Sequence, residues 1–455
     1  MKKYRIVYWL AAVCCLPLFT ACNGFLREDP RDGTDHADAY RTLSDVYLNA
    51  VASLYNYVGG YADSQGLQGT GRGVYDLNTF TTDEAIMPTR GGDWYDGGFW
   101  QGLYLHKWGV SNDAVQATWE YLYKVVMLSN KSVEQIQKFG ETHDDPELPA
   151  YLAEVRAMRA MYYYYLLDLF GRVPLVLSSS ASMSDIVQSE RKTVFDFVVK
   201  ELQEAAPLLA ESRSNRPGDY YGRITRPVAY FLLAKLALNA EVYTDNDWTD
   251  GVRPDGGTIS FTIDGRQQNA WQATVTYCDR ITAAEVDPRF DKCYFAGVMY
   301  DLKGELIRLD DGTVLEYHPW EVAVDISDTP YEKTAGARMK KYAIDTDATK
   351  DGKLMENDIV LFRYADVLLM KSEAKVRNGE NGDAELAQVR SRVGAVARPA
   401  TLENLLDERL LEFAWEGWRR QDLVRFGRFT RAYSDRPQLA GEESGYTTVF
   451  PIPGN

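Results

Sequence analysis

Long segments with the hydrophobic periodicity of α-helices dominate the chain. The clearest of them spans about 148–170, where Ala153, Ala157 and Ala160 lie on one face and a run of aromatic residues follows. Gly171 comes directly after this segment, in the position typical of a residue that ends a helix. The pattern predicts one long helix whose small-residue face lets a neighbouring helix approach closely.

Several other segments repeat this helical pattern. Pro227 stands near the start of one, where a proline fits the first helical turn. Pairs of such helices are typical of tetratricopeptide-like arrays, although no strict repeat of about 34 residues is visible. We therefore expect an all-α dominated fold built as a tetratricopeptide-like array of helix pairs. Besides 148–170, the predicted helices are 227–243 and 358–377, with shorter ones near 114–138, 192–210, 269–284, 383–393 and 401–427.

Two long stretches lack helical periodicity, one at about 57–110 and one at about 244–357. Only the predicted helix 269–284 interrupts the second stretch. Loops of this length inside a folded domain are usually functional or linker segments. Because they hold many of the tryptophans and tyrosines, we expect them to form a ligand face. The sequence predicts a single helical domain over 41–455, with these two stretches as loop-rich inserts.

The N-terminus has the features of an export signal. Lys2, Lys3 and Arg5 precede a short apolar run that ends in small residues just before Cys22. We interpret residues 1–21 as a lipoprotein signal peptide, Cys22 as the lipidation site and 22–40 as a tether. An acylated Cys22 would attach the protein to a membrane surface. The alternative is an ordinary secretory signal followed by an incidental cysteine.

The charge balance limits the partners. The chain carries a formal net charge of −16, and −19 once residues 1–21, with three cations and no acids, are removed. Nucleic acids and anionic membrane faces attract cationic surfaces, so neither is expected as a partner. Apolar content of 45% and charged content of 25% are ordinary for a globular protein.

Cysteine and histidine usage gives no sign of a metal centre or a disulfide scaffold. The four histidines are scattered, and no Cys or His pair has zinc-ligand spacing. We expect neither a metal nor a cofactor. A bond between Cys278 and Cys293 stays open, but helical spacing with Trp271 favours a free buried thiol at Cys278.

The best candidate for a ligand site is the glycine- and aromatic-rich segment 90–100. A tryptophan or tyrosine ring has an apolar face that can stack on the C–H face of a sugar, and a polar edge. Charged side chains beside it could bind hydroxyl groups. Ordinary packing of a glycine-rich loop on the helices is the alternative. The candidate ligand-binding residues here are Arg90, Asp93, Trp94, Tyr95 and Trp100.

A second candidate group lies in the middle insert, where Pro319 fixes the backbone between Tyr317 and Trp320. We expect Tyr317, Trp320 and the more distant Tyr300 to add a second wall to the same ligand face, with packing again as the alternative. By contrast, Trp108 and Trp119 fall in or near helical patterns and are expected in the core.

Paired carboxylates are candidate catalytic groups, because a glycosidase needs two of them across a cleft. Glu408, Glu412 and Glu416 fall on one face of the predicted helix 401–427, with arginines between them, which favours an ion-pair network. Asp83 and Glu84 form a better placed pair for a site. No nucleophile elbow or dinucleotide fingerprint is present, and no enzymatic activity is expected.

Short motifs spread along the chain match the residue types and order of one known family. They are Cys22-Asn23-Gly24-Phe25-Leu26 with Pro30, Arg156 to Tyr163 running into Asp168-Leu169-Phe170-Gly171-Arg172-Val173-Pro174-Leu175, Arg363 to Met370 with Glu373-Ala374, Glu408 to Leu423, and Pro451-Ile452-Pro453.

Together these motifs resemble the SusD/RagB family of lipoproteins, from Cys22 to the end of the chain. The resemblance implies an outer-membrane lipoprotein of the Bacteroidetes type that faces the cell exterior. It also implies that the protein captures glycans for a partner TonB-dependent transporter, and that its helices form a tetratricopeptide-like array.

Three functions from different classes follow. The first is glycan capture at the surface without catalysis. The second is a surface glycoside hydrolase, which only the carboxylates near aromatic residues suggest. The third is a helical-repeat scaffold needed for transporter assembly, since stacked helix pairs present concave faces.

Overall fold

The computed structural model describes residues 38–60, 66–68, 72–212, 214, 218–281, 294–295, 297–301, 303–318, 321–342, 360–433 and 436–453. The predicted signal peptide 1–21, Cys22 and the tether up to residue 37 lie outside these ranges, as does Cys293. Across the described residues, no helix combines the length and the apolar character needed to cross a membrane.

A broken N-terminal helix begins the described chain, after a 3-10 turn at Asp38–Tyr40. Helix α2 (Leu43–Val46) continues through a π-helical segment (Tyr47–Ala52) into α3 (Ser53–Val58). The Thr42 hydroxyl caps α2 by accepting from the Asp45 amide, while the Asp45 carboxylate accepts from the Thr42 amide.

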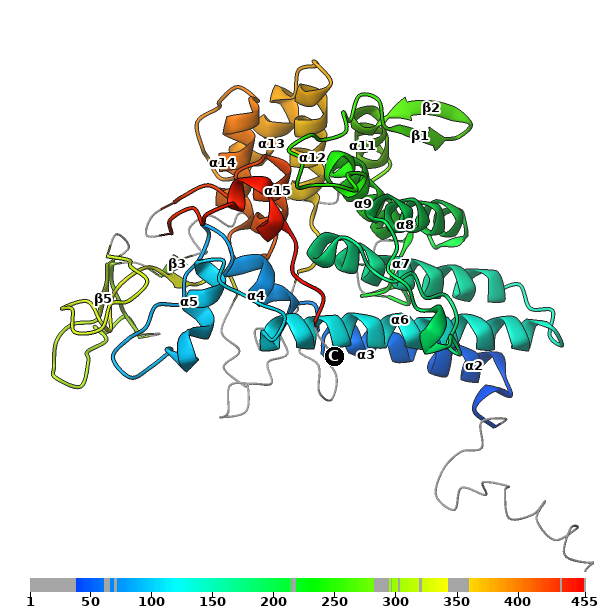
Figure 1. The fold of residues 1–455 in the computed structure, drawn as a ribbon, viewed down its shortest axis with the longest axis horizontal. Coiled ribbons are helices and arrows are strands. Elements are labelled where there is room, and N and C mark those ends of the chain that lie inside the picture. Colours follow the sequence, from blue (N-terminus) through cyan, green and yellow to red (C-terminus); the bar gives the residue numbers. More distant parts are fainter. Residues whose placement is uncertain are drawn as a thin grey trace, which may run out of the picture.

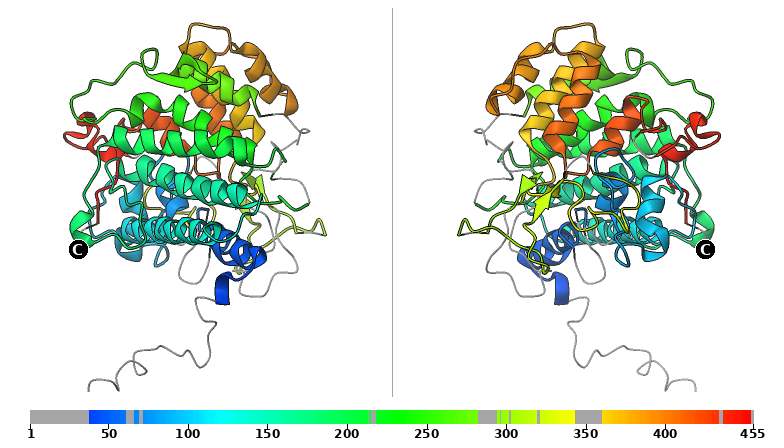
Figure 2. Two further views of the ribbon diagram at one scale, coloured as in Figure 1. Left: turned by 90° about the vertical axis from the view of Figure 1, so that its right-hand side faces the viewer. Right: turned by 90° about the vertical axis from the view of Figure 1, so that its left-hand side faces the viewer.

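The main helices follow roughly in sequence order, and each packs on an earlier one, although α11 packs on α9 and α14 packs on α12. Their stack runs from α6 at one end of the molecule to α13 and α14 at the other (Figures 1 and 2). This arrangement confirms the predicted helix-dominated array. The helices are α6 (Asp113–Gly140), α7 (Leu148–Phe170), α8 (Arg191–Ala205), α9 (Arg226–Leu238), α10 (Ala240–Tyr243), α11 (Ala270–Asp279), α12 (Tyr364–Arg377), α13 (Asp383–Arg392), α14 (Leu402–Phe413) and α15 (Arg419–Arg425).

Helix α7 has the predicted bounds and is the centre of the stack, packed between α6 and α8. Its alanine face is fully buried, as are its four consecutive tyrosines, residues 162–165. The hydroxyl of Tyr163 donates to the carbonyl of Val176, 2.9 Å away, so the ring is packed and its polar tip is satisfied. Gly171 ends the helix with a φ of 71°, which an L-residue with a side chain adopts at a cost.

Three predicted helices are shorter or divided in the structure. The segment 401–427 is two helices, because Trp415 and Gly417 have left-handed φ values of 66° and 73° between them. A Cβ on Gly417 would lie 3.3 Å from the ring of Tyr75, so this turn also needs a glycine for space. Segment 227–243 is broken at Asn239, and α12 begins at Tyr364 instead of 358.

The two irregular inserts contain short elements that the hydrophobic pattern missed. The first holds α4 (Val74–Thr79) and α5 (Phe99–Tyr104), and the second holds three antiparallel strand pairs. These elements have two to six residues, too few for a period to show. The pairs are β1 (Ser260–Ile263) with β2 (Arg266–Asn269), β3 (Tyr294–Phe295) with β6 (Arg338–Met339), and β4 (Gly297–Val298) with β5 (Glu316–Tyr317).

Two tryptophans and one cysteine occupy the core positions predicted for them. Trp108 and Trp119 are partly buried against the main hydrophobic core, with ring centroids 4.8 Å from Phe450 and 5.0 Å from Phe170. Cys278 is buried on α11, and burial raises the pKa of its thiol well above the ordinary value.

Charged side chains, in addition to apolar packing, join α9, α12 and α14. Asp366 on α12 is buried between the Lys235 ammonium of α9 and the Arg409 guanidinium of α14, each 2.6 Å from a carboxylate oxygen. Burial alone would raise the pKa of Asp366, but these two cations hold it below its ordinary value. Asp366 is therefore ionised, and its charge is compensated from two other helices.

The same network continues into the last helix. Arg409 also contacts Asp422 of α15 at 2.8 Å, and Arg425 of α15 contacts both Asp422 and Glu373 of α12. All of these side chains are buried. The network thus joins α9, α12, α14 and α15 through groups that are costly to leave unpaired.

We expect Asp366→Asn to destabilise the protein by about 3–5 kcal/mol, because the change leaves buried Lys235 and Arg409 without their shared carboxylate. Urea unfolding of the chain beginning at Asn23 measures this. The matched control is Asp407→Asn, an exposed carboxylate on α14, for which a change within about 0.5 kcal/mol is expected. Equal losses in the two variants would contradict the assigned role of Asp366.

Candidate functional site

The segment that carries the first candidate ligand residues forms a tight turn. The Arg90 amide donates to the Asp93 carbonyl at 3.0 Å, and the Asp93 amide donates back to Arg90 at 2.9 Å. Trp94 follows with a φ of 61°, an uncommon conformation for a residue with a bulky side chain. The exposed fractions of Trp94 and Tyr95 are 47% and 57%, so both rings are accessible to a ligand.

Trp100 differs from the exposed ring that was expected. It lies in the first turn of α5, is only 7% exposed, and packs edge-on against Phe80 and Phe99. Its indole N–H donates to the Asp96 carboxylate at 2.8 Å. The ring centroids of Trp100 and Trp94 are 6.2 Å apart, so the buried ring of Trp100 packs edge-on against the exposed ring of Trp94.

The second candidate group is divided between exposed and covered residues. Tyr300 is 57% exposed on a turn closed by its bridge to Leu306. Tyr317 on β5 is partly buried, and the Arg338 guanidinium lies over one of its faces, 4.7 Å from the ring centroid. Trp320 lies outside the described residues.

The two inserts, far apart in sequence, are joined by their backbones. Thr89 forms a parallel bridge to Asp325, and the Gly91 amide donates to the Ser327 hydroxyl at 2.8 Å. Gly91 has a φ of 57°, a conformation that favours glycine at this contact between the inserts. Figure 1 shows the result, with α5 and β5 on the same side of the helical stack. The sequence indicated both inserts but could not reveal their contact.

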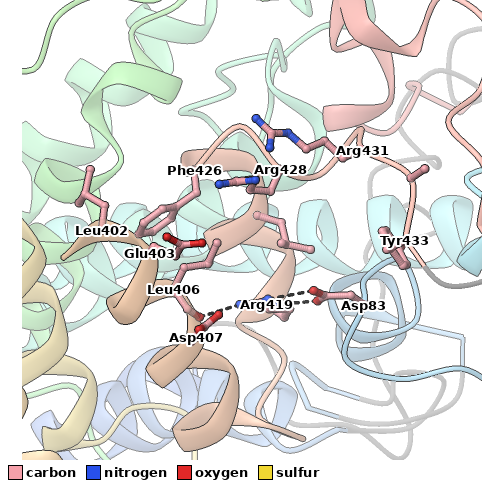
Figure 3. A pocket seen from close by; sticks show the side chains of 12 residues that line it. Asp83, Leu402, Glu403, Leu406, Asp407, Arg419, Phe426, Arg428, Arg431 and Tyr433 are labelled. Carbon is pink, nitrogen blue, oxygen red and sulfur yellow. Dashed lines mark hydrogen bonds and ion pairs between the residues drawn. The ribbon is translucent and has the colours of Figure 1, made fainter. Parts of the chain in front are cut away.

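Asp83 and Glu84 attach the first insert to the helices. Asp83 accepts two hydrogen bonds from the Arg419 guanidinium of α15, at 2.7 and 2.9 Å (Figure 3). Glu84 accepts from the Trp415 amide in the turn before α15. Both carboxylates are therefore engaged in structural contacts, which opposes a catalytic role for this pair.

A pocket of 520 Å³ lies beside this attachment point (Figure 3). Apolar side chains of α14 and α15 line it, with exposed Arg428 and Arg431 on one side and Glu403 and Asp407 on another. The candidate ligand residues do not line this pocket.

The three glutamates near the C-terminus form ion pairs, as predicted. Glu408 pairs with Arg390, and Glu412 with Arg363 and Arg392. Glu416 pairs with Arg363 at 2.7 Å and with Lys341, although it follows the end of α14 and is not on that helix. All three carboxylates are mostly buried against cations, which opposes a catalytic role for them.

Within the described part of the chain, no three His, Cys, Asp or Glu side chains are grouped so as to hold a metal ion.

Comparison with known proteins gives matches along most of the chain. The model of the SusD family matches residues 212–449, and a second model, described as starch-binding associating with outer membrane, matches residues 66–238. The starch-binding protein SusD of Bacteroides thetaiotaomicron is 24% identical, over 86% of this chain and 84% of that protein.

Two solved structures show the same fold. One is surface glycan-binding protein A of Bacteroides thetaiotaomicron in complex with laminarihexaose, with a TM-score of 0.62, 18% identity, and coverage of 90% of this chain and 96% of that chain. The other is surface glycan-binding protein A of Bacteroides uniformis, with a TM-score of 0.62, 19% identity, and coverage of 90% and 94%.

The buried carboxyl group of Glu84 is expected to make the stability of the protein depend on pH. Burial raises the pKa of its carboxyl to about 8, against the opposing effects of the Trp415 amide, Arg419 and Lys341, while Asp83 raises it further. Tyr75 is the other titratable group beside it. The folded protein therefore holds a proton that the unfolded chain releases near pH 4.5.

Because the folded-state pKa is raised, this contribution to stability is present below about pH 5 and is lost as the pH rises towards 9. We expect Glu84→Gln to remove the loss, so that the variant gains stability relative to the wild type over this range. Urea unfolding between pH 5 and 9 measures the difference, with the exposed Glu403→Gln as control. A constant difference for Glu84→Gln would contradict the burial of a protonated Glu84.

Proposed function

Because the chain belongs to the SusD family, we propose that it is a cell-surface glycan-binding protein without catalytic activity. It captures oligosaccharide or polysaccharide and delivers it to a partner TonB-dependent outer-membrane transporter. The observation that carries the proposal is the exposed aromatic turn at Trp94 and Tyr95, held beside the middle insert by backbone hydrogen bonds.

The chemistry of this surface suits sugars. An exposed indole or phenol ring can stack on the apolar face of a pyranose, and the tight turn limits the entropy lost on binding. The buried Trp100 ring packs against the Trp94 ring, and this contact holds the exposed ring in place. Arg90 and Asp93 lie at the base of the turn, where charged groups can hydrogen-bond to hydroxyls.

The second wall of the surface comes from the middle insert. Tyr300 presents an exposed ring, and Tyr317 is partly buried with Arg338 over one of its faces. We assign Trp320, next to this wall in sequence, to the same surface. Its contribution rests on sequence alone.

Relatives support binding over hydrolysis. One is named a starch-binding protein, and the neighbouring structure with laminarihexaose is named a glycan-binding protein. The carboxylates that a hydrolase would need are bound to arginine or to the backbone at Asp83, Glu84 and the three C-terminal glutamates. Glucans are therefore the first ligands to test.

We also propose attachment to the outer membrane through acylated Cys22, with the ligand face exposed to the cell exterior. The sequence before Cys22, the family, and the outer-membrane description of the second matching family model support this. Because the chain is acidic, the lipid would provide the attachment without help from electrostatic attraction.

Replacing the exposed rings tests the ligand face. We expect Trp94→Ala and Tyr95→Ala each to lower glycan affinity at least about tenfold, or about 1.4 kcal/mol, with little loss of stability. Affinity gels cast with starch, laminarin and other polysaccharides measure binding, and a reducing-sugar assay runs alongside. The control is Tyr446→Ala, an exposed tyrosine near the C-terminus.

Retardation of the wild type without sugar release supports the proposal. Sugar release by the purified protein would overturn the non-catalytic assignment. Unchanged affinity of both variants would refute the ligand face, and absence of any binding would favour the scaffold function in transporter assembly.

A change at Cys22 tests the anchor. We expect Cys22→Ser to abolish incorporation of a radiolabelled fatty acid and to move the protein from the membrane fraction to a soluble one. Cys278→Ser is the matched control, because that thiol is buried inside the fold. Membrane association unchanged by Cys22→Ser would contradict a lipid anchor.

A further inference from the structure

Two arginines from different inserts approach the same tyrosine. Arg338, the first residue of β6, lies with its guanidinium 4.7 Å from the centroid of the Tyr317 ring on β5. Arg90, from the first insert, is close enough to couple electrostatically to both Tyr317 and Arg338. The backbone bridge between Thr89 and Asp325 brings these positively charged side chains together.

Carboxylates within the described residues compensate neither guanidinium. Arg338 donates to carbonyls of its own loop, at Lys333, Ala335 and Gly336, and also hydrogen-bonds to the Tyr317 side chain. Arg90 has a buried Nε without a hydrogen-bond partner among the described residues. Most arginines that the structure describes in the core are instead paired with an acid, as in the network around Asp366.

The acidic side chains of the adjoining loop are occupied with its own backbone. The Asp325 carboxylate accepts from the Ser327 amide at 2.9 Å, and the Glu332 carboxylate accepts from the Asp328 amide at 3.3 Å. These contacts shape the loop that holds Tyr317 and Arg338. They leave the two guanidinium groups as a local concentration of positive charge in an acidic protein.

The electrostatics of the pair favour an anion. Burial lowers the pKa of Arg90, and burial together with the charge of Arg90 lowers the pKa of Arg338. Arginine stays protonated at neutral pH all the same, so the site holds two partly desolvated cations. An anionic group placed between the two guanidinium groups would offset the cost of burying them and the repulsion between their charges. It could also form bidentate hydrogen bonds.

We propose that Arg90 and Arg338 recognise an anionic substituent, a carboxylate or a sulfate ester, on a sugar ring that contacts Tyr317. This inference rests on the proposed function and narrows its ligand to acidic glycans. The net charge of −16 opposes non-specific binding of polyanions, so such binding must come from a local site. Screening over about 8 Å at physiological salt lets that site act despite the net charge.

The test compares polymers that differ in their anionic group. Polygalacturonate and its carboxyl-reduced form provide the carboxylate arm, and dextran sulfate and dextran provide the sulfate arm. We expect the wild type to bind at least one acidic polymer tenfold or more tightly than its neutral counterpart. Affinity gels and calorimetry at fixed salt measure this.

The decisive variant is Arg90→Gln, because the Arg90 side chain makes no hydrogen bond that the turn needs among the described residues. We expect the loss of affinity for the acidic polymer to be at least tenfold greater than the loss for its neutral counterpart, because Arg90 can also hydrogen-bond to hydroxyl groups. Arg338→Lys is a second variant that keeps the charge but loses the bidentate geometry, and it should bind more weakly than the wild type. Arg428→Gln and Arg431→Gln are matched controls, since each removes one exposed arginine at the pocket in Figure 3.

Each outcome bears on a different claim. Equal binding of acidic and neutral polymers, or binding of neutral polymers alone, would overturn the anion site and leave the glycan-binding function intact. The same loss in the Arg428 or Arg431 controls as in Arg90→Gln would show a general charge effect and also overturn the site. Binding of no polymer in either arm or in the neutral panel would overturn both.

Discussion

Asp366, held between Lys235 and Arg409 inside the helical stack, is the contact on which the rest of the structure depends. A buried carboxylate is stable only if its charge is compensated, so moving either helix that supplies a cation would leave a buried charge unpaired. Arg409 extends the same constraint to α15 through Asp422. Apolar packing would allow these helices to slide, whereas the charge pairs fix their register.

The position of α15 then determines the position of the ligand face. Arg419 on this helix binds Asp83, and the turn before it binds Glu84. These two contacts anchor the first insert to the helices near its middle. That insert continues through the turn at Trp94 and pairs with the middle insert at Thr89 and Asp325. A chain of direct contacts thus leads from the buried charges to the exposed rings. Loops of this length can hold a specific surface because both ends of the first insert are packed and its middle is hydrogen-bonded.

Much of the helical array could be predicted from the sequence, since long helices such as α7 have a clear period and a glycine stop. Breaks within helices were missed where tertiary contacts cause them, as at Gly417, whose close approach to Tyr75 no local pattern reveals. The ion pairing of Glu412 was predicted from its arginine-rich neighbourhood. The structural role of Asp83 could not be predicted, because its partner Arg419 is 336 residues away in sequence. Likewise, the composition of segment 90–100 indicated a site, but only packing distinguishes the exposed Trp94 from the buried Trp100.

The most direct test of this account is hydrogen–deuterium exchange with and without a glycan that the protein binds. The account predicts slower exchange in two separate peptides, one from the turn around Trp94 and one from the middle insert around Tyr317, because a single ligand contacts both. Protection confined to α14 and α15 around the pocket of Arg428 and Arg431 would contradict it, since the ligand would then bind away from the paired inserts.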